Sequence, residues 1–480
     1  MIRDGKRGRN FRRGEPGYEA ALFGTSFNRR DTGRRPARIV QANSAEEVQA
    51  AVLAARQEGL KVSLCSGGHS WSQNHIRDDV LMLDLSRLNA IEIDREAMSV
   101  RIGAGVEGAA LNRALARRGL FVPTPHAPDV GMGGFLLQGG FGWGSRAFGL
   151  GCEQVTAIEA VLADGRMVRA DAETHAELYW AARGAGPGFF AAVTAYHLRL
   201  HKRPRAIGIQ LQFFAMDQLD TVFRWVDEMG PSVSRKVELQ VLMSPYMRIG
   251  GGPTIEVIAP VLADSWAEAR AATAFVRESA IRRHARLTLP LIPMSLDRMQ
   301  KGAARSHFPD GMHWSVDNMW TDAPVEALLP GLRRIAETMP PAPSHVLWLD
   351  WRPQGGRPDM AFSVEGQRYI ALYGEWKRAE DDARFDGWAA GQMRAMAPLA
   401  CGIQLADENL GQRPARFLTD ANAARLAAAR GLYDPEERFV RWMADPVTGG
   451  GEGERAARAQ PSIHTVTAAL TAAASSATTM

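Results

Sequence analysis

The segment Leu64-Cys65-Ser66-Gly67-Gly68-His69-Ser70-Trp71-Ser72 is the first of two glycine-rich loops that organise this chain of 480 residues. The second loop runs from Gly131 to Gly144 and reads GMGGFLLQGGFGWG, with seven glycines in fourteen residues. Glycine lets the backbone approach a ligand closely, and successive N–H groups in such loops bind anions. Two such loops predict a cradle for a long phosphorylated ligand, and the histidine in the first adds an imidazole that can hold it. The alternative is that both loops are tight turns between packed strands.

Neither loop matches a common nucleotide-binding or hydrolase fingerprint. Gly131-x-Gly133 needs glycine at position 136 for a dinucleotide fingerprint, and Leu136 stands there. The sequence has no Gly-Lys-Ser/Thr and no Gly-x-Ser-x-Gly. Its eleven histidines lack the spacing of metal ligands, so we expect no metal site.

Composition indicates an intracellular globular protein of two domains. Hydrophobic residues make up 46% and charged residues 23%. Residues 1–38 hold eleven Lys and Arg against four acids, which predicts a solvated basic arm over residues 1–35. This arm lacks interleaved aromatic residues, so no nucleic-acid partner is expected. Three scattered cysteines, no signal sequence and no long apolar run predict a cytoplasmic protein without membrane contact.

The pattern of strands and helices predicts an α+β chain with a boundary near Pro204. The first unit covers residues 36–203 and includes a hairpin whose turn is Ala163-Asp164-Gly165-Arg166. The second covers residues 204–405 and has a mainly antiparallel sheet. Its predicted strands are 207–214, 236–243, 254–260, 345–351 and 368–373, and its predicted helices are 216–229, 264–278, 323–338 and 379–397. A segment over 406–446 follows, and the Ala- and Thr-rich residues 447–480 are predicted to be disordered.

Val62-x-x-x-Ser66-Gly67-Gly68-His69-Ser70 resembles the flavin-attachment loop of the berberine-bridge-enzyme-like oxidases. These form a branch of the vanillyl-alcohol-oxidase superfamily with a PCMH-type FAD-binding fold. The resemblance is dense over 36–203, weak across 204–400, and returns near 417–442. Further matching stretches are Asp84 to Asn89, Gly103-Ala104-Gly105, Val130 to Phe135, Gly139 to Leu150, Leu178 to Gly184, Gly188 to Thr194, and Tyr433-Asp434-Pro435.

The resemblance implies a two-subdomain FAD-binding domain over 36–203, a substrate-binding domain over 204–405, and a segment over 406–446 that returns to the FAD domain. It implies that His69 carries the 8α-methyl group of FAD covalently. It also implies that Asn422 reaches the cofactor from the C-terminal segment and that Val193 lies against the isoalloxazine. The remaining implied FAD-binding residues are Ser66, Gly67, Gly68, Ser70, Val130, Gly131, Gly133, Gly134, Gly139, Gly140 and Gly142.

Three positions refine these expectations. Many members have a second flavin link through a cysteine at the position of Ala127, so a single tether through His69 is expected. Valine at position 130 goes with access of O2 to the flavin in this family, which favours an oxidase. Gly402 and Gln404 stand where a Tyr-x-Asn motif often occurs, so the usual catalytic tyrosine is missing.

The catalytic base therefore has to be inferred from residue chemistry. A base must lie within hydrogen-bond reach of the substrate proton. Tyr373 and Glu375 share one face of a predicted strand with Ala371, and we take these two as the catalytic candidates. Further candidates are Asp350, Glu365, His307 and His313.

The sequence thus predicts an FAD-dependent oxidase that takes a hydride from an alcohol-type or natural-product substrate to flavin N5. The expected partners are that small molecule and O2, with H2O2 as the product. A tailoring flavoenzyme for ring closure or oxygenation stays open on the same fold. A redox-silent flavin-binding homologue stays open from a different functional class.

Overall fold

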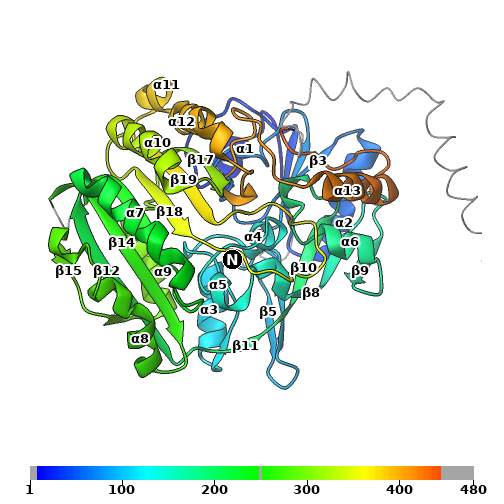
Figure 1. Cartoon of the computed structure of the whole chain (residues 1–480). Helices are drawn as coiled ribbons and strands as arrows, with labels where there is room; N and C mark the ends of the chain where they lie inside the picture. Colours follow the sequence, from blue (N-terminus) through cyan, green and yellow to red (C-terminus); the bar gives the residue numbers. More distant parts are fainter. Residues whose placement is uncertain (1–7, 248–250, 445–480) are drawn as a thin grey trace, which may run out of the picture.

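The computed structural model describes residues 8–247 and 251–444 (Figure 1). Two sheets and a two-stranded ribbon are formed by the N-terminal unit (36–203) together with β1 (Arg9–Arg12), and one large sheet belongs to the unit that follows (204–405). Within the described residues, no helix combines the length and apolar composition that a membrane crossing requires. The predicted disordered tail, 447–480, lies outside the described residues.

The first sheet is small and has the strand order β1-β2-β4-β3. Strands β2, β4 and β3 are parallel, and β1 joins them antiparallel. The segment predicted as a basic arm therefore contributes β1 and α1, and Tyr18 and Leu22 of α1 are buried. The bounds are β1 Arg9–Arg12, α1 Tyr18–Gly24, β2 Arg38–Gln41, α2 Ala45–Gln57, β3 Val62–Cys65 and β4 Leu81–Asp84.

Helix α2 shows why the local sequence forms this unit. The Ser44 hydroxyl accepts a hydrogen bond from the N–H of Glu47, and the Glu47 carboxylate accepts one from the N–H of Asn43. The Ser44 bond caps a free N–H group of the first turn, and the Glu47 bond holds the residue that precedes the cap. Val48 and Val52 recur at helical spacing and are fully buried. Strand β3 then ends at Cys65, directly before the first glycine loop.

The second sheet is antiparallel, with the order β5-β6-β10-β8-β9. The predicted hairpin is confirmed as β8 paired with β9. A two-stranded ribbon of β7 and β11 lies beside it. The bounds are β5 Ile91–Asp94, β6 Ser99–Gly103, α3 Gly108–Ala116, β7 Leu120–Phe121, α4 Met132–Leu137, α5 Ser145–Phe148, β8 Val155–Val161, β9 Met167–Asp171, α6 Ala176–Ala181, β10 Ala192–Arg199 and β11 His201–Lys202.

The large sheet has the order β15-β12-β14-β13-β18-β19-β17, and all these pairs are antiparallel. The predicted α+β class with a mainly antiparallel second sheet is confirmed. The five predicted strands correspond to β12, β14, β13, β18 and β19. The strand bounds are β12 Ala206–Ala215, β13 Gln240–Met247, β14 Gly252–Ala263, β15 Leu287–Thr288, β16 Ile292–Pro293, β17 His313–Thr321, β18 His345–Asp350 and β19 Arg368–Trp376.

Each face of the large sheet has a different partner (Figure 1). Alternate residues such as Val241, Trp348 and Ile370 pack in one core with the helices of this unit. The other set, including Tyr369, Ala371 and Tyr373, packs with Phe27 and Trp71 of the N-terminal part of the chain. The helix bounds are α7 Leu219–Met229, α8 Trp266–Arg277, α9 Leu296–Ser306, α10 Val325–Thr338, α11 Asp382–Phe385, α12 Trp388–Met396 and α13 Asp420–Tyr433.

Three elements of this unit differ from the sequence prediction. Strand β17 and helix α9 were not predicted. The predicted helix 379–397 is divided into a 3-10 turn, α11 and α12. The interruption falls at Asp386 and Gly387, where glycine lowers helix propensity.

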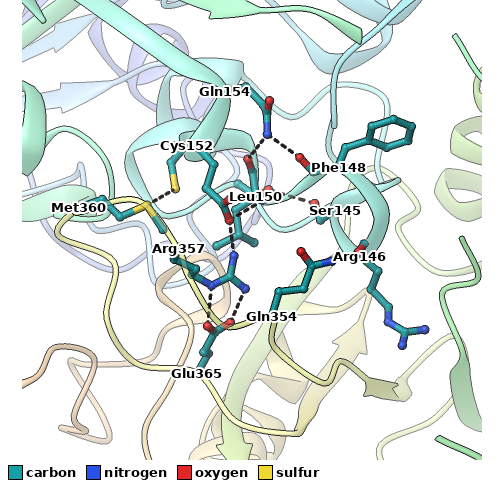
Figure 2. Close-up of polar contacts among 12 residues, drawn as sticks. Ser145, Arg146, Phe148, Leu150, Cys152, Gln154, Gln354, Arg357, Met360 and Glu365 are labelled. Atoms are coloured by element: carbon teal, nitrogen blue, oxygen red, sulfur yellow. Dashed lines mark hydrogen bonds and ion pairs between the residues drawn. The ribbon is translucent and has the colours of Figure 1, made fainter. Parts of the chain in front are cut away.

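A bridging loop, residues 352–367, connects β18 to β19 and lies against the N-terminal unit (Figure 2). The Arg357 guanidinium pairs with Glu365 of the same loop and with Glu153 of the N-terminal unit. Cys152 is fully buried, with Sγ 3.6 Å from Sδ of Met360. The bridging loop therefore joins the two units, and its Phe362 lies against Gly139 of the second glycine loop.

Candidate functional site

A cavity lies between the two glycine loops and the face of the large sheet that carries Tyr369 and Tyr373. Its far side is formed by Phe308, Leu347, Tyr369, Tyr373 and Asp407. The cavity is lined by the residues proposed from the first glycine loop, by those at the start of the second loop, and by Val193 of β10. These are Ser66, Gly67, Gly68, His69, Ser70, Val130, Gly131, Gly133, Gly134 and Val193.

The two glycine loops touch each other through their backbones. A Cβ atom at Gly131 would lie 2.7 Å from Cα of Gly67, and one at Gly133 would lie 2.6 Å from the Ala104 carbonyl oxygen. Only glycine permits this approach. A Cβ atom at Gly134 would instead meet nothing within 4 Å, although Gly134 lines the cavity. The loops thus form a wall with free space at Gly134.

His69 lies at the cavity wall, where a contact of its Nε2 atom and the stacking of its ring hold it in place. Its Nε2 lies 3.2 Å from Oδ2 of Asp129, and its ring stacks on Phe27 with centroids 4.4 Å apart. Burial alone would raise the pKa of Asp129, but the hydrogen bond and charge of His69 outweigh it, so this pKa is lowered. The Nδ1 atom of His69 is buried and has no hydrogen-bond partner among the described residues. That nitrogen is therefore available to a group in the cavity.

Asp407 is a buried carboxylate that sequence reasoning missed. Its Oδ2 accepts hydrogen bonds from the hydroxyls of Tyr369 and Tyr373, the latter at 2.9 Å. Its Oδ1 accepts one from Nε1 of Trp71 at 2.7 Å. Burial raises the pKa of Asp407, although these three donors oppose the rise. The pKa values of both tyrosines are raised well above the usual range by burial and by the charge of Asp407.

Asp407 is positioned by the unpredicted strand β17. The side-chain amide of Asn318 donates to the carbonyl oxygens of Gln404 and Asp407, at 2.9 Å and 2.8 Å. The guanidinium of Arg413 donates to both carboxylate oxygens of Asp317, each at 2.6 Å. These bonds fix the segment that carries Asp407 against the sheet. The signal in the sequence was faint, because Asp407 lies in a stretch that was noted only for its missing tyrosine.

Of the two predicted catalytic residues, only Tyr373 reaches the cavity. Strand alternation placed Glu375 on the correct face, but Glu375 lies beyond the cavity, where Nδ1 of His345 is 3.0 Å from its Oε1. Burial raises the pKa of Glu375 well above its usual range and lowers that of His345. The His345 ring stacks on Tyr373, with centroids 4.6 Å apart. Glu375 therefore lies behind Tyr373 rather than among the lining residues.

The remaining catalytic candidates from the sequence lie outside the cavity as well. Asp350 pairs with Arg352, and Glu365 pairs with Arg357. His313 contacts Asp382 at 2.7 Å. Burial lowers the pKa of His307 to about 4, and its ring packs on His345. None of these side chains is among the residues that line the cavity.

Four predicted FAD-binding residues also lie away from the cavity. Gly139 and Gly140 have positive φ values of 109° and 80°, and a Cβ at Gly140 would lie 2.8 Å from Cα of Gly151. Gly142 lies against the Thr124 carbonyl. Asn422 donates to the carbonyl oxygens of Met360 and Ala361, at 2.9 Å and 3.1 Å. The three glycines thus shape the second loop, and Asn422 holds the bridging loop.

The lining of the cavity is aromatic and has little positive charge. Trp71, Phe141 and Phe308 line it together with the two tyrosines of the sheet. Among the described lining residues there is no Lys or Arg, and Asp407 is the carboxylate. Ala127, which stands where many relatives are expected to have a flavin-linked cysteine, also lines the cavity. Cys152 does not line it.

Comparison with known proteins agrees with this geometry. Residues 36–171 match the family model described as an FAD binding domain. The chain is 28% identical over 435 residues to the FAD-linked oxidoreductase nodO of Hypoxylon pulicicidum, covering 86% of this chain and 92% of that protein. Its fold matches a crystal structure of 6-hydroxy-D-nicotine oxidase from Arthrobacter nicotinovorans with a TM-score of 0.79 and 23% identity, over 92% of this chain and 98% of that one. It matches BBE-like 1 of Physcomitrella patens with a TM-score of 0.77 and 18% identity, over 90% and 96% of the two chains. The resemblance predicted from the sequence is confirmed.

Proposed function

We propose that this chain, an FAD-linked oxidoreductase of the berberine-bridge-enzyme-like, PCMH-type family, is an oxidase for an alcohol- or amine-bearing carbon of a small or natural-product substrate. O2 is the proposed acceptor, and H2O2 the proposed product. The observation that carries the proposal is the pair of groups facing one cavity, Asp407 with its two tyrosines and His69 with its unpartnered Nδ1.

The residues present fit FAD. The touching glycine loops, the open space at Gly134 and the buried Nδ1 of His69 are what a dinucleotide with a covalent link to imidazole requires. We infer a single link through His69, because Ala127 offers no nucleophile and Cys152 is buried outside the cavity. FAD held by these residues would supply a two-electron acceptor for the hydride and a route for the electrons to O2, the proposed acceptor.

Asp407 is the proposed base, in place of the predicted Tyr373 and Glu375. A carboxylate accepts the O–H or N–H proton of the substrate when it lies within hydrogen-bond reach. Its three donors, Trp71, Tyr369 and Tyr373, orient it and stabilise its charged form against the cost of burial. We infer that the tyrosines position the base and form part of the substrate surface.

The same lining supports a substrate class. Aromatic side chains on several sides favour an aromatic or other flat apolar body. A buried carboxylate without a lysine or arginine among the described lining residues disfavours an anionic substrate. A neutral or cationic aromatic alcohol or amine therefore suits this cavity.

The proposal is tested first by the cofactor. Intact mass measured after denaturation is expected to show an FAD adduct on the purified protein, and His69→Ala is expected to lose it. His197→Ala is the matched control, because His197 also contacts a carboxylate, Glu159 at 2.8 Å, but lies outside the cavity. An adduct that persists in His69→Ala would remove the proposed attachment site.

Turnover is tested on the same protein. A panel of aromatic alcohols and amines is mixed with the protein without O2, and flavin bleaching is followed. At least one compound is expected to bleach the flavin, and readmitted O2 is expected to restore its colour with formation of H2O2. A flavin that bleaches but is not reoxidised by O2 would argue for a dehydrogenase.

A further inference from the structure

A second polar pair reaches the cavity from the boundary between the two units. His126 lines the cavity, and its Nε2 lies 2.6 Å from Oε1 of Glu238, which precedes β13 in the large-sheet unit. The Glu238 side chain is 5% exposed and that of His126 is 21% exposed. The pair is thus nearly removed from bulk water, yet one of its members faces the cavity.

In the His126 ring, one nitrogen is engaged by Glu238 and the other is not. An ionised carboxylate only accepts, so Nε2 of His126 carries the hydrogen and donates it to Glu238. No described residue forms a hydrogen bond with Nδ1 of His126. Trp143 fixes the orientation, because its ring packs edge-on against His126 with centroids 4.5 Å apart and its Nε1 donates to the His126 carbonyl at 3.3 Å. His126 therefore presents a fixed ring with one unused nitrogen.

Glu238 is more than a surface partner for the histidine. Gln240 donates to the same Oε1 at 2.7 Å, while Oε2 is buried without a hydrogen-bond partner among the described residues. Buried polar atoms are nearly always paired, so an unpaired carboxylate oxygen indicates a site that is completed by a further donor. The pair thus has unused hydrogen-bonding capacity on both residues.

His126 and Asp407 face the same space. Both line the cavity. Burial dominates the pKa of Asp407 and raises it, the three hydrogen bonds oppose that rise, and the charge of His126 adds a smaller opposing effect. A molecule in the cavity can therefore meet Asp407 through one polar group and His126 through another.

We propose that His126, held by Glu238, is a specificity-determining residue that hydrogen-bonds a second polar group of the substrate, apart from the group that meets Asp407. The proposal rests on the proposed function in taking this cavity as the place of the substrate. It narrows the substrate class to aromatic compounds with two hydrogen-bonding groups. A site built to hydrogen-bond a substrate group disfavours the analogue that lacks this group, because the buried polar atoms of the site then stay unpaired.

Binding of paired probes tests the proposal. The probes are benzyl alcohol, with one polar group, and the three hydroxybenzyl alcohol isomers, with two. Their dissociation constants are measured by calorimetry on the purified holoenzyme without O2. At least one isomer is expected to bind the unmodified protein about tenfold tighter than benzyl alcohol, the effect of one net hydrogen bond. His126→Phe is expected to remove this preference, measured as the ratio of the two dissociation constants in the same variant.

Two further variants distinguish a hydrogen bond from His126 to the substrate from a general structural effect of the substitution. Glu238→Gln keeps His126 but weakens its orientation, so it is expected to lose part of the preference. His197→Phe, which disrupts a similar His–Glu pair outside the cavity, is expected to retain all of it. A preference that persists in His126→Phe, or the absence of any preference or binding in the unmodified protein, would overturn the proposal. Calorimetry reports binding without turnover, so a protein that shows the preference but never reduces its flavin would contradict only the proposed function.

Discussion

Single residues define the chemistry of this cavity through the partners of their polar atoms. His69 has one nitrogen engaged by Asp129 and the other buried without a described partner. Asp407 accepts three hydrogen bonds and is nevertheless destabilised as an anion by burial. A raised carboxyl pKa beside a cavity is typical of a residue that exchanges protons.

The role of Asp407 predicts a pH dependence. Because its pKa is raised, kcat/KM for a flavin-reducing substrate is expected to increase with pH as Asp407 loses its proton. Asp407→Asn is expected to slow anaerobic flavin reduction by about 10²- to 10⁴-fold, the usual contribution of a general base, and to remove this part of the pH profile. Stopped-flow spectrophotometry across pH measures both.

Tyr373→Phe is the companion variant. It removes a donor that lowers the pKa of Asp407, so the rise in rate is expected to move to higher pH while the carboxylate remains. An unaltered pH profile in both variants would mean that another group is the base.

At the scale of elements, β17 holds the segment that carries Asp407. Asp317 of β17 is fully buried and pairs with Arg413, and burial raises its pKa to about 6 despite that partner. Asn318, the next residue, bonds the backbone on both sides of the turn at 405–407. The proposed base is therefore placed by a strand that is distant in sequence.

Removal of Arg413 is expected to leave a buried carboxylate without its counter-ion. Arg413→Met is expected to lower the free energy of unfolding by about 3–5 kcal/mol near pH 8. The loss is expected to be smaller at pH 5, because the folded protein then holds Asp317 protonated. Arg413 lowers the pKa of Asp317, so in the variant this pKa lies above the value of about 6 and the protonated form persists to higher pH before its stabilising effect is lost. Urea unfolding at the two pH values measures the difference. Adding Asp317→Asn to the variant should recover part of the loss, and no recovery would contradict the ion-pair argument.

At the scale of the whole molecule, the bridging loop and the C-terminal segment connect the two units. Asn422 lies in the first turn of α13, and its side-chain amide donates to two carbonyl oxygens of the bridging loop. Arg425 pairs with Glu177 of α6 and with Asp359 of the bridging loop. Val62 of β3 exchanges backbone hydrogen bonds with residues 438 and 440. The C-terminal segment thus lies beside the strand that leads into the first glycine loop.

These contacts favour a structural role for Asn422 over the role at the cofactor that was expected from the sequence. Asn422→Ala is expected to lower the free energy of unfolding by about 1–3 kcal/mol, because two backbone carbonyls lose their donor. The FAD adduct is expected to remain on His69. Chemical unfolding combined with intact mass measures both quantities, and loss of the adduct in a folded Asn422→Ala protein would return Asn422 to the cofactor site.

The sequence alone determined the features that are local or periodic. Val48 and Val52 recur at helical spacing, Asp164-Gly165 marks a hairpin, and five strands of the large sheet show in apolar runs. The two glycine loops predicted a cradle for a phosphorylated ligand, and the contact of Gly67 with Gly131 is one that only glycine permits. The α+β class and the position of His69 in a first loop followed from these signals.

Tertiary structure decided which polar residues meet. Alternation along β19 placed Tyr373 and Glu375 on one face, but in the tertiary structure Glu375 contacts His345 and lies outside the cavity. Asp407 meets Trp71 across 336 residues of chain, and no local pattern encodes that contact. Strand β17 was missed because it is buried on both faces and lacks the alternation of a half-exposed strand. Local backbone conformation depends on neighbouring residues, whereas the hydrogen-bond partners of a buried carboxylate depend on how distant elements pack.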